Sequence, residues 1–583
     1  MGRRIRRESD NLFAIPKGAN VTKTNAVYVN VGNYRIEPGD GRKPYTSHKK
    51  LCIGVVYLNS DGTSSGMMYG NDNYYQHFQV EMLPEPPERA DSISVGPRLL
   101  TEVISEEYSL VNNLVDVFGT ADASLILDLA MYMLTEEKAI FQHYPAWGRR
   151  HELYSSTARS DSYISRFLGK SITYSKIMKF RDQWARDNIG NGRVYYCYDS
   201  TNTNSQAEGV FIVQKGHAKD DPTLMQVNTD YVVRQEDGLP LTFMEFPGSI
   251  VDIAEASEMI KELNRVSCDV DVDITLICDR GYISEENVLL MDDAGIGFLL
   301  MLKTNMGVHG EILDLYSSKV KNNYACYLRE YDEFGMTIER PLFDSEKNRW
   351  FHLLWNQTLE GKHRKRLLTA IENKRKELEK AVDRKTKYSE DNLKSIAKWF
   401  TLCVEESGEI IVKKKGRGGN KKTEKSFIIT AFKENSRMIS NDLERCGFYL
   451  LVSSQKMDIL EARNAYAKRD CVEKVFQALK SSLGMDEIGV ASDDNIQGKS
   501  LIWFVASILH SILFNRTKPL RVKDKKSYTV PAIMDKIEAI VADKNLSTGR
   551  YVRRYKLDKK QNEIFKACGI SVSRLDEMIR EME

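Results

Sequence analysis

Two aspartates lie at the ends of predicted β-strands and could act on a ligand. Asp199 ends a strand predicted from YYCYDST, and Asp279 ends one predicted from ICDRGY. Carboxylates at strand ends face the crevice in which α/β sheets commonly bind ligands. The alternative is that each residue only forms a turn, because Asp is favoured in turns.

A third acid belongs to a polar quartet with helical spacing. Tyr466, Arg469, Glu473 and Lys480 occupy positions i, i+3, i+7 and i+14 of one helix predicted over 459–483. At 100° per residue they share a stripe about 60° wide. Such a set suits a phosphate: Arg clamps it with a planar fork, Tyr donates a hydrogen bond, and Lys adds a point charge. A solvated helix face is the alternative interpretation.

Seven predicted elements would position the two aspartates. They are strands at 193–201, 209–216 and 239–246, a helix at 252–265, a strand at 273–279, a helix at 284–294 and a strand at 297–303. Three meandering strands followed by alternating helices and strands is the order of a ribonuclease-H-like core. Many other α/β and α+β folds begin in the same way, so the order alone leaves them open.

The quartet resembles the signature of a known family. Tyr-x2-Arg-x3-Glu-x6-Lys is typical of a group of bacterial insertion-sequence transposases of the DDE class, and all four residues of the quartet match it. The segments around Asp199 and Asp279 resemble the two aspartate-bearing strands of that group. The resemblance covers about 191–303 and 446–515, and the chain has Ser249 where the group usually has Asn.

The resemblance implies a DNA transposase that binds the terminal inverted repeats of its element, cleaves at the ends and transfers the 3′ ends to target DNA. It implies that Asp199, Asp279 and Glu473 are catalytic and hold two Mg²⁺ ions, for which Mn²⁺ could substitute. Two such ions about 4 Å apart serve phosphodiester cleavage, and Mg²⁺ prefers carboxylate oxygens. Tyr466, Arg469 and Lys480 would hold double-stranded DNA at the transposon end. Joining two ends implies a homodimer or a higher assembly.

Two other functions remain open at this point. A ribonuclease-H-like nuclease without strand transfer would need the same acids but not the whole quartet. A domesticated, non-catalytic DNA-binding protein would need neither the acids nor the quartet. This alternative predicts that the acids have been lost by mutation.

The predicted organisation is an α/β catalytic core interrupted by an insertion. Six segments are expected: an N-terminal β-rich region (1–91), a helical DNA-binding region (92–190), the first part of the core (191–304), a β-rich insertion (305–445), the second part of the core with the catalytic helix (446–515), and a helical C-terminal region (516–583).

Composition indicates a folded protein of the reducing cytoplasm, and the resemblance implies association with the nucleoid. The 583 residues are 42% apolar and carry a net charge of only +2, which argues against disorder. The nine cysteines include no CxxC pair, which argues against zinc and disulfide frameworks. The apolar stretch 501–514 is too short to span a bilayer, so a buried helix and no membrane partner are expected.

Basic residues concentrate in two stretches that could contact DNA. Residues 1–50 contain eleven Lys and Arg against four acids, and residues 362–425 contain twenty against ten. Within the second stretch, Lys413, Lys414 and Lys415 are predicted to bind the DNA backbone from a mobile loop. Solvated surface is the alternative for both stretches.

Overall fold

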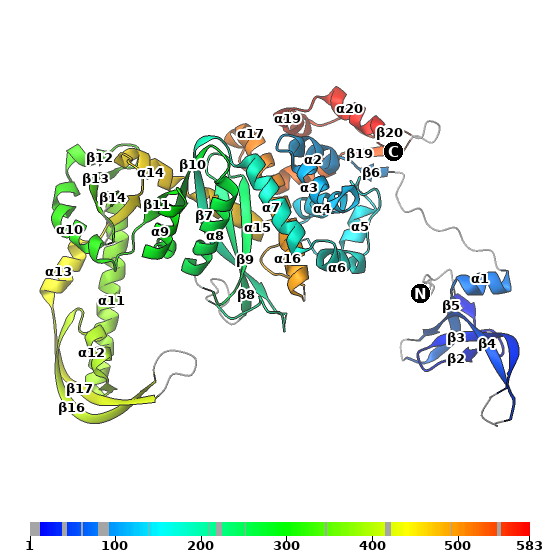
Figure 1. The fold of residues 1–583 in the computed structure, drawn as a ribbon, viewed down its shortest axis with the longest axis horizontal. Helices are drawn as coiled ribbons and strands as arrows, with labels where there is room; N and C mark the ends of the chain where they lie inside the picture. Colours follow the sequence, from blue (N-terminus) through cyan, green and yellow to red (C-terminus); the bar gives the residue numbers. More distant parts are fainter. Residues whose placement is uncertain are drawn as a thin grey trace. The chain divides into compact units, whose positions relative to one another are not determined.

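The computed structural model describes residues 12–37, 43–59, 62–79, 92–137, 139–207, 209–216, 224–250, 252–343, 347–413, 421–490, 492–544 and 550–582. The chain divides into two compact units, Met1–Pro87 and Glu88–Glu583. Each unit has its own core, and Figure 1 shows the elements of both.

The first unit is a small antiparallel sheet with one helix. Its elements are β1 (Leu12–Ala14), β2 (Asn20–Val21), β3 (Ala26–Ile36), β4 (Tyr45–Leu58), β5 (Ser64–Gly70) and α1 (Asp72–Phe78). The sheet order is β1-β5-β4-β3-β2, and Val27, Ile53 and Met68 are fully buried in its core. The strands predicted in this region are therefore confirmed.

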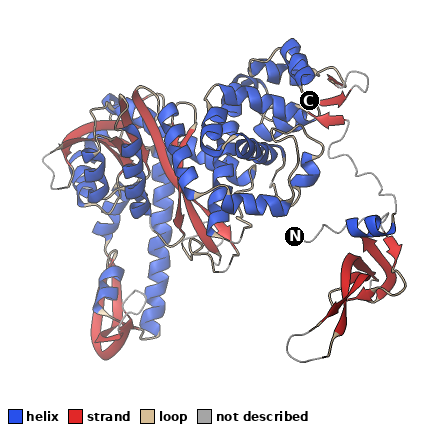
Figure 2. Ribbon diagram, turned by 45° about the vertical axis from the view of Figure 1, so that its right-hand side comes forward, coloured by secondary structure: helices blue, strands red, loops and turns tan. Residues whose placement is uncertain are grey.

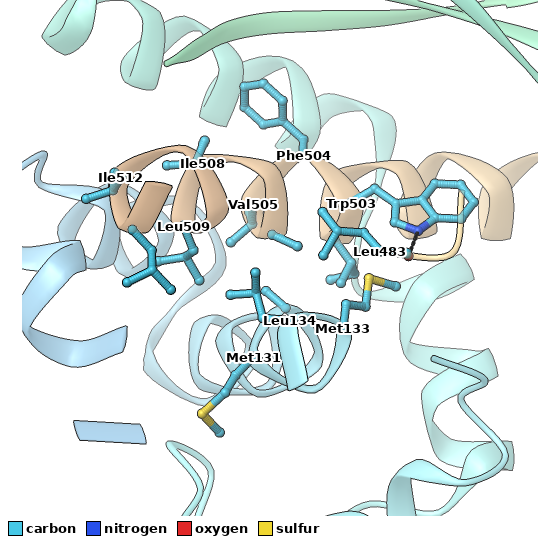
Figure 3. Close-up of a cluster of buried hydrophobic side chains, with 14 of the residues drawn as sticks. Met131, Met133, Leu134, Leu483, Trp503, Phe504, Val505, Ile508, Leu509 and Ile512 are labelled. Atoms are coloured by element: carbon cyan, nitrogen blue, oxygen red, sulfur yellow. Dashed lines mark hydrogen bonds between the residues drawn. The ribbon is translucent and has the colours of Figure 1, made fainter. Parts of the chain in front are cut away.

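The second unit begins with a helical region that packs around one central helix. The elements before the core sheet are β6 (Ser92–Ser94), α2 (Gly96–Glu106), α3 (Leu110–Phe118), α4 (Thr120–Thr135), α5 (Tyr144–Gly148), α6 (Asp161–Lys170) and α7 (Tyr174–Asn188). They pack on α16 (Asp493–Arg516), which contacts α4 and α6 most extensively. Figure 3 shows Val505 and Leu509 of α16 pointing toward α4, on the side where Leu134 lies.

Helix α16 is long and apolar enough, by length and composition, to cross a membrane. However, 89% of its apolar window is buried inside the protein. Trp503 is 1% exposed and donates a hydrogen bond to the Leu483 carbonyl oxygen at 3.0 Å. The buried helix predicted for this stretch is confirmed.

The C-terminal segment returns to the start of the helical region. It contains α17 (Lys518–Lys523), α18 (Val530–Glu538), β19 (Val541–Lys544), β20 (Tyr551–Arg553), α19 (Lys559–Ala567) and α20 (Val572–Glu581). Strand β19 pairs with both β20 and β6, so the predicted all-helical tail also contributes two strands.

The core of the second unit is one nine-stranded sheet. Its order is β12-β13-β14-β18-β11-β10-β7-β8-β9. The first part contains β7 (Gly192–Ser205), β8 (Met225–Arg234), β9 (Pro240–Pro247), α8 (Asp252–Ser267), β10 (Val272–Cys278), α9 (Glu285–Asp293) and β11 (Gly297–Met301). Strands β7, β8 and β9 form an antiparallel meander, whereas β10 runs parallel to both β7 and β11.

Helices cover both faces of this sheet, as Figure 2 shows. Alternate residues of β7 serve the two faces: Cys197 packs in the cluster that contains α15 and α16, whereas Tyr196 and Tyr198 pack with α8. This alternation follows from the two-residue period of a strand, and it explains why β7 is apolar on both sides.

The second strand of the meander differs from the prediction. Residues 209–216 form no strand, and β8 takes that place instead. Val210, Ile212 and Val213 are buried in the core around α16, and the Ile212 N–H donates to the Asp493 carboxylate at 2.9 Å. The predicted strand is reduced to a single bridge between Gln214 and Gln226 of β8, because the apolar side chains before it are buried in the core instead of lying along a strand.

The predicted insertion contributes directly to the core sheet. Its elements are α10 (Gly307–Val320), β12 (Tyr327–Leu328), β13 (Glu333–Pro341), β14 (Asn348–Trp355), α11 (Gln357–Asp383), β15 (Lys387–Tyr388), α12 (Glu390–Ile396), β16 (Phe400–Lys413), β17 (Lys421–Glu434) and α13 (Ser436–Glu444). Strand β18 (Phe448–Ser453) joins β14 to β11 by antiparallel pairing on both sides. Only the sheet β15-β17-β16 and its helices form a separate small core.

Candidate active site

The two aspartates are neighbours across the central strands. The parallel pairing of β7 with β10 ends at Tyr198 and Cys278, so Asp199 and Asp279 occupy the next position on adjacent strands. Adjacent strands lie about 4.8 Å apart. Asp199 does not end its strand as predicted, because β7 continues to Ser205 in pairing with β8. Asp199 instead marks the point where β10 diverges from β7.

Local hydrogen bonds orient both carboxylates. Asp279 caps a short 3₁₀ helix and accepts the Arg280 N–H at 2.6 Å. Tyr282 follows in the same turn and donates its phenol to Asp199 Oδ1 at 3.1 Å. The turn after β10 therefore fixes one aspartate and contacts the other.

The quartet spans two helices, α14 (Ile459–Ala467) and α15 (Asp470–Ser481), with Arg469 in the turn between them. The single helix predicted across it is wrong. The Gln235 side-chain amide donates to the Ala465 carbonyl oxygen at 2.7 Å, which is the acceptor that a continuous helix would offer to the Arg469 N–H. That N–H bonds the Tyr466 carbonyl oxygen instead, and the chain turns there.

Arg469 sits at this turn and joins two of the three acids. Its Nη1 donates to Asp199 Oδ2 at 3.2 Å and its Nη2 to Glu473 Oε1 at 2.6 Å. The guanidinium is planar and short, so these two carboxylate oxygens lie within about 8 Å of each other. The Arg469 and Asp199 side chains are 15% and 19% exposed, whereas that of Glu473 is 55% exposed.

The electrostatics of the site follow from this crowding of acids. Burial of the Arg469 guanidinium acts to lower its pKa, but Tyr466, Asp199, Asp279 and Glu473 together raise that pKa. Burial raises the pKa of Tyr466, and the nearby aspartates raise it further while Arg469 opposes them. The Tyr466 phenol is therefore a hydrogen-bond donor at neutral pH.

Lys480 lies away from the other members of the quartet. It is in the last turn of α15, seven residues after Glu473 and hence about 10 Å further along the helix axis. The structure thus brings together Asp199, Asp279, Tyr466, Arg469 and Glu473, but not Lys480.

Two cavities open beside the acids, and Asp279 lines both. The core cavity, about 750 Å³, lies along β7 and β8 and is lined by Asp199 and by the amides of Asn202 and Asn228. The insertion-side cavity, about 640 Å³, extends from Glu473 toward β13, β18 and α11. An extended ligand bound across the acids would therefore have a cavity on each side of them.

Basic side chains line the insertion-side cavity. Arg280 and Lys362 face it, and in the described part of the chain no carboxylate pairs with either of them. Burial lowers the pKa of His363, and the charges of Arg366 and Arg280 lower it further. His309 is 5% exposed and lines the same cavity, and its Nε2 has no hydrogen-bond partner among the described residues.

No individual role was predicted for Arg280, Lys362 or His363. Arg280 directly follows Asp279, and Lys362 begins the basic stretch 362–425 that was predicted to contact DNA. Those two positions were the available signals, and the fold was needed to bring them to one cavity.

The acids offer the right donors for a hard divalent cation, but they do not surround one point. Among the residues that the structure describes, no three His, Cys, Asp or Glu side chains are grouped as a metal centre. Arg469 lies between Asp199 and Glu473 and takes one oxygen of each. Three carboxylates on adjacent elements nevertheless fit the oxygen preference of Mg²⁺.

The predicted lysine loop lies outside the described residues. Strand β16 ends at Lys413, whose side chain is not described, and Lys414 and Lys415 belong to the segment 414–420. The contact of these lysines with DNA stays a prediction.

Comparison with known proteins identifies one family. The family model described as "Transposase DDE domain" matches residues 196–509, which span every acid above. No curated protein matches the chain. A cryo-EM structure of a piggyBac transposase synaptic complex with hairpin DNA is similar over 76% of this chain and 79% of that chain, with 10% identity and a TM-score of 0.33.

Proposed function

The chain belongs to the transposase DDE domain family, and on that premise we propose that it cleaves DNA at the ends of its own element and joins the 3′ ends to target DNA. The observation that carries this proposal is the meeting of three acids separated by up to 274 positions, with Arg469 bonded to two of them. We further propose that the chain belongs to the insertion-sequence group with the Tyr-x2-Arg-x3-Glu-x6-Lys signature.

We infer that β7 to β11 with α8 and α9 form a ribonuclease-H-like core. An antiparallel meander followed by two parallel strands supports this assignment, as does the position of the acids where β10 leaves β7. The strands β12 to β14 and α11 extend this core on the side of Glu473.

In this proposal Asp199, Asp279 and Glu473 would hold two Mg²⁺ ions. When bound, the ions would activate the attacking oxygen and stabilise charge on the leaving oxygen. Asp279 is fixed by the Arg280 N–H and Asp199 by the Tyr282 phenol, so both carboxylates are oriented before DNA arrives. Glu473 is the exposed member, which leaves it free to adjust.

Arg469 and Tyr466 would contact the scissile region of the DNA. Arg469 would exchange its carboxylate partners for a phosphate, which suits its planar fork equally well. Tyr466 keeps its proton and would donate to a second phosphate oxygen. Arg280 and Lys362 have no carboxylate partner among the described residues and would hold a neighbouring phosphate in the insertion-side cavity.

The partners follow from the reaction. We propose that the terminal inverted repeats are read by the helices between Gly96 and Asn188 and that at least two copies of the chain act together, because two ends must be joined. Such a protein would work in the cytoplasm on the nucleoid.

The test uses a duplex carrying the short inverted repeat that flanks the gene. Asp199→Ala, Asp279→Ala and Glu473→Ala should each abolish Mg²⁺-dependent cleavage and keep end binding, because phosphate contacts dominate affinity. Asp470→Ala is the matched control, because Asp470 shares the first turn of α15 but pairs with Lys474 at 2.8 Å. Cleavage by Glu473→Ala would exclude Glu473, and cleavage without end joining would indicate a simple nuclease.

A further inference from the structure

The strands β3 and β4 continue beyond the small sheet as a two-stranded ribbon. Strand β2 pairs with β3 only at Val27 and Tyr28, and β5 pairs with β4 only between Gly54 and Leu58. Residues 30–36 and 45–50 therefore pair only with each other. Most of their side chains are exposed, and Figure 2 shows this hairpin extending past the other strands of its unit.

One face of the ribbon is built from hydrogen-bonding side chains. The register pairs Asn30 with Lys50, Asn33 with His48, and Arg35 with Thr46, and directly paired residues share a face. We call these six residues the amide face. No buried core lies behind it, so these side chains are available to a ligand.

The centre of the amide face is held in place by its own contacts. The Asn30 amide donates to Asn33 Oδ1 at 2.9 Å, and His48 Nδ1 lies 2.6 Å from the same oxygen. His48 Nδ1 also lies 3.0 Å from the Asn30 amide nitrogen, so Asn30, Asn33 and His48 form one closed hydrogen-bonded group. Three side chains are oriented without using all of their donors and acceptors.

The charge of the ribbon favours a polyanion. Arg35, Lys49 and Lys50 are exposed. Within residues 30–37 and 43–50, the part of the hairpin that the structure describes, the one acid is Glu37, whose carboxylate lies 3.9 Å from Arg35 Nε with both side chains more than 70% exposed. In the described part of the ribbon no carboxylate pairs with either lysine.

We propose that this ribbon enters the major groove of DNA with its amide face toward the base edges. The major groove is about 12 Å wide and admits a two-stranded ribbon. Asn and Arg are the side chains that read adenine and guanine edges, and Thr and Lys also contact bases there. The ribbon lies in the first compact unit, so the chain would have a DNA-binding element separate from the catalytic unit.

Lys49 and Lys50 provide a matched pair for the test. They are adjacent, equally charged and both exposed, but Lys50 lies on the amide face and Lys49 pairs with Gly32 on the other face. The full chain selects duplexes from a randomised library, and binding of the selected duplex is then measured by fluorescence anisotropy at several salt concentrations without divalent metal.

Lys50→Ala and Arg35→Ala should each weaken binding of the selected duplex by on the order of ten-fold, whereas Lys49→Ala should leave that binding unchanged. Arg35→Ala and Asn33→Ala should also reduce discrimination at one base position by on the order of ten-fold. Equal effects of Lys49→Ala and Lys50→Ala, or no effect of either, would overturn the proposal. Cleavage is not measured, so this result is independent of the proposed reaction.

Discussion

Replacing Arg469 by Ala tests whether this side chain competes with the metal for the acids. Its contact with Asp199 joins two side chains less than 20% exposed, and a hydrogen bond to a charged partner contributes about 1.5–3 kcal/mol. Glu473 is 55% exposed, so its contact adds less than about 1 kcal/mol. Arg469→Ala should therefore lower the free energy of unfolding by about 2–4 kcal/mol without metal.

The same change should strengthen Mg²⁺ binding. In the native chain a cation must displace Arg469 from Asp199 and Glu473, whereas in the variant both carboxylates are released. About 1.4 kcal/mol corresponds to a factor of ten in affinity. Arg469→Ala should therefore bind Mg²⁺ at least ten-fold more tightly, while losing cleavage because the phosphate clamp is absent.

The assay is thermal unfolding across a Mg²⁺ titration, supported by Mn²⁺ binding measured by electron paramagnetic resonance. Arg463→Ala is the control: Arg463 lines the insertion-side cavity from α14, but it bonds the buried Glu333 at 2.7 Å and none of the three acids. It should lose comparable stability with unchanged Mg²⁺ affinity. Weaker or equal Mg²⁺ binding by Arg469→Ala would refute the competition.

Three further changes test separate parts of the second unit. His352 is fully buried and burial lowers its pKa to about 4, so the unfolded chain binds more protons between pH 4 and about 6.5. Stability should fall by up to about 3 kcal/mol as the pH drops through that range, and His352→Asn should reduce the fall in urea unfolding. Replacing Arg280 and Lys362 by Ala should flatten the salt slope by up to about 1.8 without changing base preference, and unchanged slopes would remove the cavity from the DNA path. Alanines at 413–415 should flatten it by up to about three, and an unchanged slope would exclude that loop.

Local patterns were sufficient to predict many elements. A helix was predicted at 284–294, and Ser284 does cap α9 by accepting the Asn287 N–H at 3.1 Å. The alternation of strands and helices after β9 was also predicted, because each element there is apolar, short and bounded by turn residues. These features are determined by residues close in the sequence, so they could be predicted before the fold was known.

The features that depend on distant partners could not be predicted. The apolar side chains at 209–216 gave a strand-like pattern, yet Asp493 and the core around α16 hold that segment as a loop. Strands β13 and β14 were assigned to a separate insertion, since nothing local indicates that β18 would join them to the core sheet. In both cases the deciding contact lies more than 90 positions away.

In the quartet, local sequence determines the helices, whereas a distant contact accompanies the turn between them. Its spacing fits a continuous helix, and the turn at Arg469 exists because Gln235, more than 200 positions earlier, takes the Ala465 carbonyl oxygen. At that turn Arg469 reaches back to Asp199 and forward to Glu473. Lys480 has only the helix to position it, and it lies a further two turns away. The residues that meet the aspartates are thus those beside the break, so Gln235→Ala should affect the placement of Arg469 more than any change at Lys480.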